Sequence, residues 1–405
     1  MITDRHFPPD RRVEKEAAAL KRAGHAVFLL ALGHADFITD LEIESGALHV
    51  RYVPELRHLN RLRNSYEFQR TLRNRHWQDH IRRFVSDFRI DVVHVHDLPL
   101  LATALDAARP IHLPVVADLR AHYPTLVELR RARVSPFLAP LLAPPRRWVG
   151  YEARALAEAV HTLVTSDEAR QHLIESHPLW PDLITTILDA EEVERFASPD
   201  GEAREQRLGG DRLSIVAVGG HGDQGGLDTA LLALPRVAER LPHAGLVVVG
   251  ADRREASRLK AVARRAGVSE RLALEDALPA EQLRAGMIAV LPYARNVHTE
   301  TVLPHELFVY MLLAVPVIAS DCAPLRRIVE ESGCGLVFPA GDADALAAQI
   351  VRLGEDAALR RTYGQAGRVA TEAKYNWEAE ARKLTAVYER INRERPLQPP
   401  GLIAD

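Results

Sequence analysis

Short runs of aliphatic and β-branched residues alternate with longer helical stretches along most of the chain. One such stretch is VEKEAAALKRAG (13–24), in which Gly24 is placed to end a helix. This alternation is typical of βαβ units built around a parallel sheet. In the first half the predicted strands are AVFLLAL (26–32), ALHVRYV (47–53), DVVHVH (91–96), PVVADL (114–119), HTLVTS (161–166) and LITTIL (183–188).

A polar stretch without apolar period, ASPDGEAREQRLGGD (197–211), interrupts the alternation and indicates an interdomain linker. We therefore predict an α/β protein with two doubly wound, Rossmann-like domains, over 1–195 and 212–375, with the linker at 196–211. The pattern further predicts an amphipathic helix over 376–392 and a loose, Pro-rich tail over 393–405. The strands predicted for the second domain are RLSIVAVGG (212–220), AGLVVVG (244–250), MIAVLPY (287–293), VPVIAS (315–320) and CGLVFP (334–339).

Composition excludes several classes of protein. The 405 residues include 52 Lys and Arg against 55 Asp and Glu, so no basic excess points to nucleic acid. The two cysteines, Cys322 and Cys334, are too few for a disulfide framework and fit a reducing cytosol. No apolar run reaches the roughly 18 to 20 residues that span a bilayer. The opening MITDRHFPPDRR lacks the apolar core of a secretory signal, so we expect a cytoplasmic protein.

In open α/β sheets ligands bind at the carboxyl ends of the strands, so function is sought in the loops that follow them. The first such loop, in VAVGGHGDQGGLDTALLAL (216–234), runs from a strand through a glycine-rich turn into a helix. It has no Lys-Ser or Lys-Thr pair and is not a Walker A loop. We predict that its backbone N–H groups bind an anion, against the alternative of a plain tight turn. Its glycines are Gly219, Gly220, Gly222, Gly225 and Gly226.

A long polar loop follows the predicted strand that ends at Leu291 and Pro292. It leads to Pro304, which we expect at the first position of a helix over 305–313. A polar loop of this length between buried strands is usually functional, so we predict ligand contact rather than a plain solvated loop. Its candidate residues are Arg295, His298, Glu300 and Thr301.

Two strand ends of the first domain carry further candidates. In VVHVHDLPLL (92–101), His94 fits an interior histidine, whereas His96 and Asp97 stand at the end of the strand. In ADLRAHYPTL (117–126), the next strand end offers Asp118, Arg120 and His122. We expect no metal site, because the HExxH and CxxC spacings are missing.

Two stretches are locally basic. The first, residues 57–83, fits a solvated helix face and contains Arg57, Arg61, Arg63, Arg70, Arg73, Arg75, Arg82 and Arg83. The second, residues 129–149, predicts peripheral contact with an anionic membrane or with a hydrophobic acceptor. It interleaves five arginines with Phe137, Leu138, Leu141, Leu142 and Trp148.

Several segments, in this order along the chain, resemble the family 4 glycosyltransferases of the GT-B fold. They are RHFPPDRRVEKEAAALKRAGHAV, DVVHVHDLP, VTSDEAR, the glycine-rich loop, LPHELFVYMLLAVPVIASD, GCGLVFPAGDADALAAQI and YNWEAEARKLTAVYERI. The resemblance covers nearly the whole chain. It implies an N-terminal acceptor domain and a C-terminal nucleotide-sugar domain facing a central cleft, with the last helix crossing back to the first domain. It also implies sugar transfer with retention, with a nucleotide-sugar as substrate and no metal or other cofactor.

The chain departs from this family at the donor site. The Arg and Lys that relatives carry around the glycine-rich loop correspond to Gly220 and Gln224. The family's LPxKLFEYM reads LPHELFVYM, so that its Lys and Glu have become Glu306 and Val309. In the first domain the family's DxHE reads Asp118-Leu119-Arg120-Ala121. An acidic Glu306 at a helix start would repel a diphosphate that the family's cations neutralise.

Substitutes for the missing cations must then come from elsewhere in the second domain. We group Arg253, His305 and Glu306 with the candidates of the polar loop as donor-site residues; Arg254 is a further cation beside Arg253. Three readings stay open: an active glycosyltransferase with a rearranged donor site, a lapsed glycosyltransferase that acts as a binding or partner subunit, and a GT-B sugar-nucleotide epimerase. The donor sugar, the acceptor and any oligomeric state are not decided by the sequence.

Overall fold

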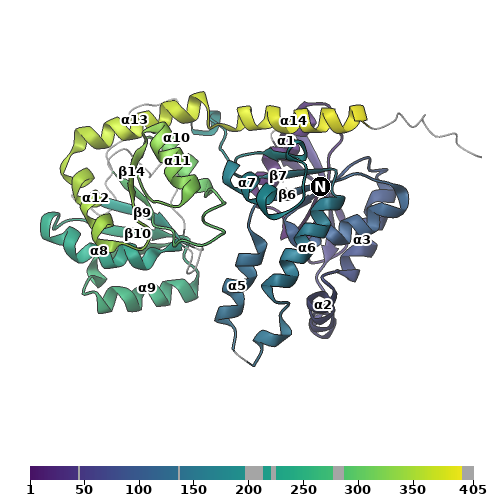
Figure 1. Ribbon diagram of the computed structural model, residues 1–405, viewed down its shortest axis with the longest axis horizontal. Helices are drawn as coiled ribbons and strands as arrows, with labels where there is room; N and C mark the ends of the chain where they lie inside the picture. Colours follow the sequence, from purple (N-terminus) through teal and green to yellow (C-terminus); the bar gives the residue numbers. More distant parts are fainter. Residues whose placement is uncertain (44–45, 136, 197–212, 220–224, 277–286, 395–405) are drawn as a thin grey trace, which may run out of the picture. The chain divides into compact units, whose positions relative to one another are not determined.

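The computed structural model describes residues 1–43, 46–135, 137–196, 213–219, 225–276 and 287–394. The chain divides into two compact units, unit 1 with Met1–Ile187 and Glu378–Asp405, and unit 2 with Leu188–Trp377. Each unit is a mainly parallel sheet covered by helices (Figure 1). Among the described residues, no helix combines the length and the apolar character needed to cross a bilayer.

Unit 1 contains an eight-stranded sheet in the order β3-β4-β2-β1-β5-β6-β7-β8. Only β3 runs antiparallel to its neighbour, β4. The six predicted strands of this half are confirmed. Two more, β1 and β3, were not predicted, because ITDRH and ITDLEI break every apolar run with charged residues. The strands are β1 Ile2–His6, β2 Phe28–Gly33, β3 Ile38–Ile43, β4 Gly46–Pro54, β5 Val93–His96, β6 Val115–Leu119, β7 His161–Val164 and β8 Ile184–Thr186.

Several helices of unit 1 begin at a residue whose side chain caps the first turn. For example, α1 begins after Asp10, whose side chain accepts a hydrogen bond from the Val13 N–H. Helices α5 and α6 pack on each other as a hairpin that projects from the unit (Figure 1). The helices are α1 Arg11–Arg22, α2 His58–Thr71, α3 Arg75–Asp87, α4 Leu101–Ala108, α5 Tyr123–Arg133, α6 Pro145–Glu158, α7 Asp167–Ser176 and α14 Trp377–Glu394.

Unit 2 contains a six-stranded, all-parallel sheet in the order β11-β10-β9-β12-β13-β14. Five strands were predicted; β11 was not, because LALE is half-exposed and has no apolar run. The strands are β9 Ser214–Val218, β10 Gly245–Val249, β11 Leu272–Glu275, β12 Ile288–Leu291, β13 Val317–Ser320 and β14 Gly335–Phe338. The helices are α8 Leu227–Arg240, α9 Arg253–Arg265, α10 His305–Leu312, α11 Ala323–Ser332, α12 Ala343–Glu355 and α13 Ala357–Ala373.

The structure moves the boundary between the units. Residues 188–195, which we expected in the first domain, group with unit 2 because Leu188 and Ala190 pack into its core. The predicted linker, 196–211, lies outside the described residues except for its first position. Helix α14 packs on unit 1, where the Arg390 guanidinium donates to the Asp182 carbonyl (2.8 Å). Pro304 caps α10 rather than opening it.

Candidate functional site

In unit 1 the predicted residues converge at the carboxyl ends of β5 and β6. Strand β5 is buried along its length, and it ends at His96. Asp97 follows with φ +66° and ψ 157°, a backbone region that residues other than glycine adopt at a cost of roughly 1–3 kcal/mol. Its N–H donates to the Asp118 carbonyl on β6 (2.8 Å). Such strain is typical of functional sites, and it turns the Asp97 carboxylate away from the path of the strand.

Asp118 is the centre of a buried network. The Arg12 guanidinium donates to both of its oxygens, from Nη2 to Oδ1 (2.8 Å) and from Nε to Oδ2 (3.0 Å). His96 Nδ1 lies 2.9 Å from Oδ2. Burial opposes ionisation of Asp118, but Arg12 and the two neighbouring histidines outweigh it and hold the pKa of this carboxyl well below its usual range. Asp118 is therefore an anion that fixes the tautomer of His96.

Arg120 organises a second group of charges beside this network. Its Nη1 donates to both oxygens of Asp10 (3.0 and 2.8 Å), and its Nη2 donates to Asp97 Oδ2 (2.7 Å). Arg5 donates to the same Asp97 oxygen (3.1 Å). Burial and, to a smaller extent, the nearby Asp97 raise the pKa of Asp4 to about 6. The predicted His96, Asp97, Asp118 and Arg120 thus form one continuous site.

His122 stands apart from that site. It is the N-cap of α5, where Nδ1 accepts from the Thr125 N–H (3.4 Å), and its ring meets the edge of His172 at 5.0 Å. Burial lowers the pKa of His122, so the ring is neutral near pH 7. The structure gives His122 a capping role at the start of α5.

The fold assembles four possible metal ligands that no local spacing reveals. Glu16, His94, His96 and Asp118 each offer one atom within 4.8 Å of the others. Arg12 lies in the same cluster, with its Nε 3.0 Å from Glu16 Oε1 as well as on Asp118. A fixed guanidinium between the two carboxylates supplies the positive charge that a metal ion would bring and repels a second cation. The cluster is therefore read as a salt-bridge network.

Sequence reasoning missed the contribution of β1 and α1 to this site. Arg5, Asp10, Arg12 and Glu16 all come from the segment that begins at the end of β1. Because β1 was not predicted, its loop was not recognised as one that follows a strand. The charged DRR at 10–12, directly before a helix, was the available signal.

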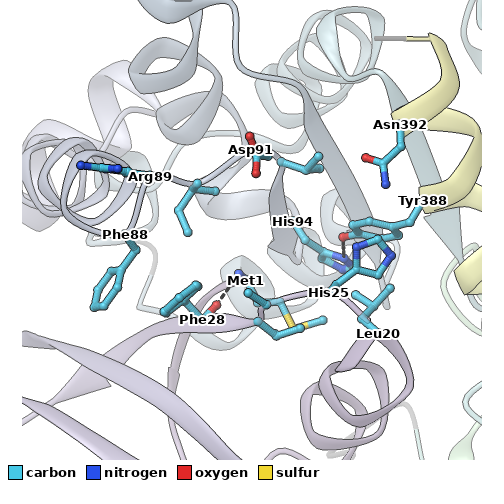
Figure 2. Close-up of a pocket in the computed structure, with 14 residues that line it drawn as sticks. Met1, Leu20, His25, Phe28, Phe88, Arg89, Asp91, His94, Tyr388 and Asn392 are labelled. Atoms are coloured by element: carbon cyan, nitrogen blue, oxygen red, sulfur yellow. Dashed lines mark hydrogen bonds between the residues drawn. The ribbon is translucent and has the colours of Figure 1, made fainter. Parts of the chain in front are cut away.

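A cavity of about 470 Å³ lies at the opposite, amino ends of β1, β2 and β5, beside α14 (Figure 2). Its wall includes Met1, Phe28, His94 and Tyr388. His94 Nδ1 lies 2.9 Å from the Tyr388 hydroxyl, and burial lowers the pKa of His94 to about 3. The cavity shares only His94 with the Asp118 network, so it does not mark the active site.

In unit 2 two glycines of the first loop are explained by close packing. A Cβ at Gly219 would lie 2.8 Å from Ala251 Cα. Gly226 has φ +57°, and a Cβ there would lie 1.7 Å from the Pro292 carbonyl oxygen. These positions need glycine whether or not the loop binds an anion. Gly225 is buried beside Gly226, whereas Gly220 and Gly222 lie outside the described residues.

Arg295 ties together the loops that follow β12, β13 and β14. Its guanidinium contacts the carboxylates of Glu300 and Asp321. Glu300 also accepts from the Ala323 N–H at the start of α11 (3.0 Å), and Asp321 accepts from the Ala340 N–H (2.8 Å). We expect Arg295 to face a diphosphate; in the structure its half-exposed guanidinium is paired with these two carboxylates.

The remaining candidates of unit 2 fall into two groups. The Thr301 hydroxyl donates to the Val297 carbonyl (2.7 Å), and the His298 carbonyl accepts from the Thr301 N–H (3.1 Å), so this part of the loop is a structural turn. Arg253 is exposed at the start of α9, after β10. Both groups follow strand ends, but no interaction joins Arg253 to the loop among the described contacts.

His305 occupies the first position of α10, and both of its ring nitrogens face acceptors. Nδ1 lies 2.9 Å from the Asp189 carbonyl oxygen, and Nε2 lies 3.1 Å from Glu191 Oε1. Sequence reasoning missed Asp189 and Glu191, because it assigned them to the first domain. The α10 start thus places the His305 ring between these two residues and beside Glu306.

Comparisons with known proteins agree with this geometry. Residues 9–188 match the "Glycosyl transferase 4-like domain" model, and residues 212–356 match "Glycosyl transferases group 1". The chain is 27% identical over 316 residues to the phosphatidyl-myo-inositol mannosyltransferase of Mycobacterium leprae, covering 77% of this chain and 76% of that protein.

Two solved structures show the same fold. Sucrose-phosphate synthase of Thermosynechococcus elongatus superposes with a TM-score of 0.78 at 18% identity, covering 97% of this chain and 98% of that one. Anabaena HepE, in complex with UDP-glucose, has a TM-score of 0.71 at 14% identity, covering 96% and 98%. With the family models matched in both halves and the polar sites at the strand ends, the chain belongs to the family 4 glycosyltransferases of the GT-B fold.

Proposed function

We propose that this glycosyltransferase moves a sugar, with retention and without a metal, from a nucleotide-diphosphate sugar to a hydroxyl of a lipid-linked acceptor. The observation that carries the proposal is the position of both polar sites, at the carboxyl ends of β5 and β6 in unit 1 and of β12 and β13 in unit 2. Ligands of open α/β sheets bind at these ends. The mannosyltransferase relative and the UDP-glucose of HepE support the choice of substrates.

In this proposal unit 2 binds the donor. Helices α8 and α10 have no side-chain cap bond at their N-termini, so their first N–H groups can face a diphosphate. His305, whose Nε2 lies 3.1 Å from Glu191 Oε1, supplies a cation at the α10 start when its ring binds a second proton. Relatives place Lys one residue later. Arg253 and Arg295 supply further positive charge. Together they neutralise the diphosphate as the bond to the sugar breaks.

Unit 1 then binds the acceptor. The acceptor oxygen forms a bond to the sugar carbon that the diphosphate leaves, and its proton goes to the departing diphosphate. Asp97, held between Arg5 and Arg120, is placed to accept a hydrogen bond from an acceptor hydroxyl. Asp118 and Arg12 position Asp97 indirectly, because they fix His96, which ends β5 directly before Asp97. We propose that the basic stretch at 129–149 brings the protein to the inner face of a membrane.

A second candidate is a lapsed transferase that binds a partner or a nucleotide without turnover. Two residues favour it. Glu306 puts a carboxylate where relatives have a cation, and Val309 cannot accept hydrogen bonds from ribose hydroxyls. Both lie on α10, which is otherwise intact.

Calorimetric titration with UDP-, GDP- and dTDP-sugars tests the donor site. We expect one class to bind saturably and His305→Gln to weaken its binding about tenfold or more, as for a bond to a charged group. Arg265→Gln, a change of charge in the last turn of α9, is the control and should bind as the wild type does. If no nucleotide sugar binds, the donor site proposed here does not exist.

A further inference from the structure

The α5–α6 hairpin ends in a cluster of exposed apolar side chains. Residues 137–142, here the hairpin tip, include Phe137, Leu138 and Leu141, with exposed fractions of 91%, 54% and 55%. Figure 1 shows the hairpin projecting from the sheet of unit 1, with this turn at its far end. Three large apolar side chains gathered on a projecting turn are unusual for a surface in water and mark an interaction site.

Hydrogen bonds hold the backbone of the hairpin tip in one conformation. Arg131 Nη1 donates to the Ala139 carbonyl oxygen (2.6 Å) and also to that of Leu142. The Leu138 and Ala139 N–H groups donate to the Ser135 carbonyl (2.8 and 2.9 Å). Residues Ala139–Leu141 form a short 3₁₀ turn between these bonds. The apolar side chains are therefore presented with little conformational freedom left to lose on binding.

The base of the hairpin is anchored to the rest of unit 1. Trp148, which the sequence suggested as part of the apolar surface, is instead buried, with its ring centroid 4.5 Å from that of Tyr123. Gln69 on α2 accepts from the Ala143 N–H (2.8 Å), and Arg147 Nη1 donates to the Gln69 carbonyl (2.9 Å). Within the described residues of the hairpin, the large apolar side chains that are more than half exposed therefore lie at the tip.

The charge around the tip has one sign. Between residues 129 and 149 the chain has five arginines and no Asp or Glu. Arg130, Arg131 and Arg133 lie in the last turn of α5, and Arg146 and Arg147 lie in the first turn of α6. The contacts of Arg131 and Arg147 described above are with carbonyl oxygens, which leave the positive charge in place. We call these five arginines the arginine collar. A cationic collar next to an apolar tip matches the anionic headgroups and the acyl chains of a bilayer.

We infer that the hairpin tip inserts into an anionic lipid bilayer, with Phe137, Leu138 and Leu141 among the acyl chains and the arginine collar at the phosphate headgroups. This inference rests on the proposed function, because it brings unit 1 to the surface where a lipid-linked acceptor lies. The alternative occupant of the tip is the surface of another protein. The like charge of all five collar residues favours the bilayer, whose anionic headgroups are dense and evenly distributed.

Flotation of the full-length protein with vesicles tests the inference without any use of activity. The probes are phosphatidylcholine vesicles with and without 30% phosphatidylglycerol. We expect binding to the anionic vesicles only, weakened by 0.5 M NaCl, and a loss of at least tenfold on Phe137→Ser/Leu138→Ser/Leu141→Ser. Ile111→Ser removes an apolar side chain of similar exposure, 58%, from another turn of unit 1 and should bind as the wild type does.

The depth of insertion has its own readout. Tryptophan emission of Phe137→Trp should be quenched by brominated acyl chains more than that of the wild type. The inference is overturned if the wild type does not float, or if the tip variant floats equally well. It is also overturned if the wild type is a dimer in sedimentation that the tip variant converts to monomer, because the tip is then a protein interface. None of these outcomes bears on nucleotide-sugar binding by unit 2, which calorimetry tests separately.

Discussion

Asp97 combines a strained backbone with a carboxylate that lies in the candidate active site. Its carboxylate lies between Arg5 and Arg120. Burial opposes ionisation of Asp97, but these two cations outweigh it and hold its pKa below the usual value. We expect Asp97→Gly to be about 1–3 kcal/mol more stable than Asp97→Ala, because glycine relieves the strain that alanine retains.

Urea denaturation of the two variants measures this difference. Both remove the carboxylate, so they serve as each other's control for the lost ion pairs. Equal stability would mean that the backbone at 97 is not strained. Both variants should also lose sugar transfer, in contrast to a variant of the exposed and unrelated Ile111.

His94 makes the stability of unit 1 depend on pH. Burial lowers the pKa of His94 from 6.5 to about 3, so the folded state keeps the ring neutral while the unfolded state binds a proton. The unfolded state then gains stability as the pH falls from about 6.5 toward 3. Between pH 7.5 and 5.5 this histidine should cost the folded state about 1.4 kcal/mol.

The pH dependence is measured by urea denaturation of the wild type and His94→Gln at both pH values. The variant is expected to be less stable overall, since it loses the Tyr388 contact, but its loss between pH 7.5 and 5.5 should be smaller by that amount. An identical pH dependence in the two proteins would show that His94 is not the responsible group.

At the scale of elements, the start of α10 decides whether the donor site works. If the chain is a lapsed transferase, Glu306→Lys with Val309→Glu should restore weak nucleotide binding, because the helix and its uncapped N-terminus are in place. Each restored bond to a charged group contributes about 1.5–3 kcal/mol before ordering costs. Calorimetry checks this, with Glu306→Gln/Val309→Gln as a control that removes the acidic charge and adds no cation.

The opposite result is equally informative. If the wild type binds a nucleotide sugar tightly and the double change abolishes that binding, the α10 start is an alternative donor site and the lapsed reading is wrong.

The Arg295 bridge joins three loops of unit 2, and its removal tests whether their arrangement matters for binding. Arg295→Ala leaves the carboxylates of Glu300 and Asp321 unopposed at the end of the sheet. We expect nucleotide affinity to fall by about 1.5–3 kcal/mol. The melting temperature should change little, since the bridge is half-exposed. Arg265→Ala, in the last turn of α9, is the control. Unchanged affinity would remove Arg295 from the donor site.

The sequence predicted the elements well wherever the apolar period was clear. It missed β1 and β3, whose apolar residues are interrupted by charges, and the short, half-exposed β11. The missed β1 had the larger consequence. Without it, the loop carrying Asp10 and Arg12 could not be assigned to a strand end. Asp118 and His96 were predicted as site residues from their place on strands. The bridge from Arg12 to Asp118, which spans 106 positions, follows only from the folded topology.

At the scale of the whole molecule, the two units match the family in order and extent, yet the donor-site cations of the family are replaced. The fold was predictable because it depends on many apolar positions, and a few polar substitutions leave it unchanged. The donor site was harder to predict from the sequence than the fold, because His305 gains its partners only when residues 188–192 join unit 2. In the proposed site, a protonated His305 offsets the substitution of Lys by Glu306 at the neighbouring position.

The most direct test of the account is release of nucleoside diphosphate from UDP-, GDP- and dTDP-sugars in the presence of vesicles of mixed phospholipids that include phosphatidylinositol. The account predicts that one donor class is turned over above the level of heat-denatured protein, and that His305→Gln and Asp97→Ala each reduce the rate at least tenfold. If no donor is turned over, although the folded protein binds one of them, the chain is a lapsed transferase and the central claim is contradicted.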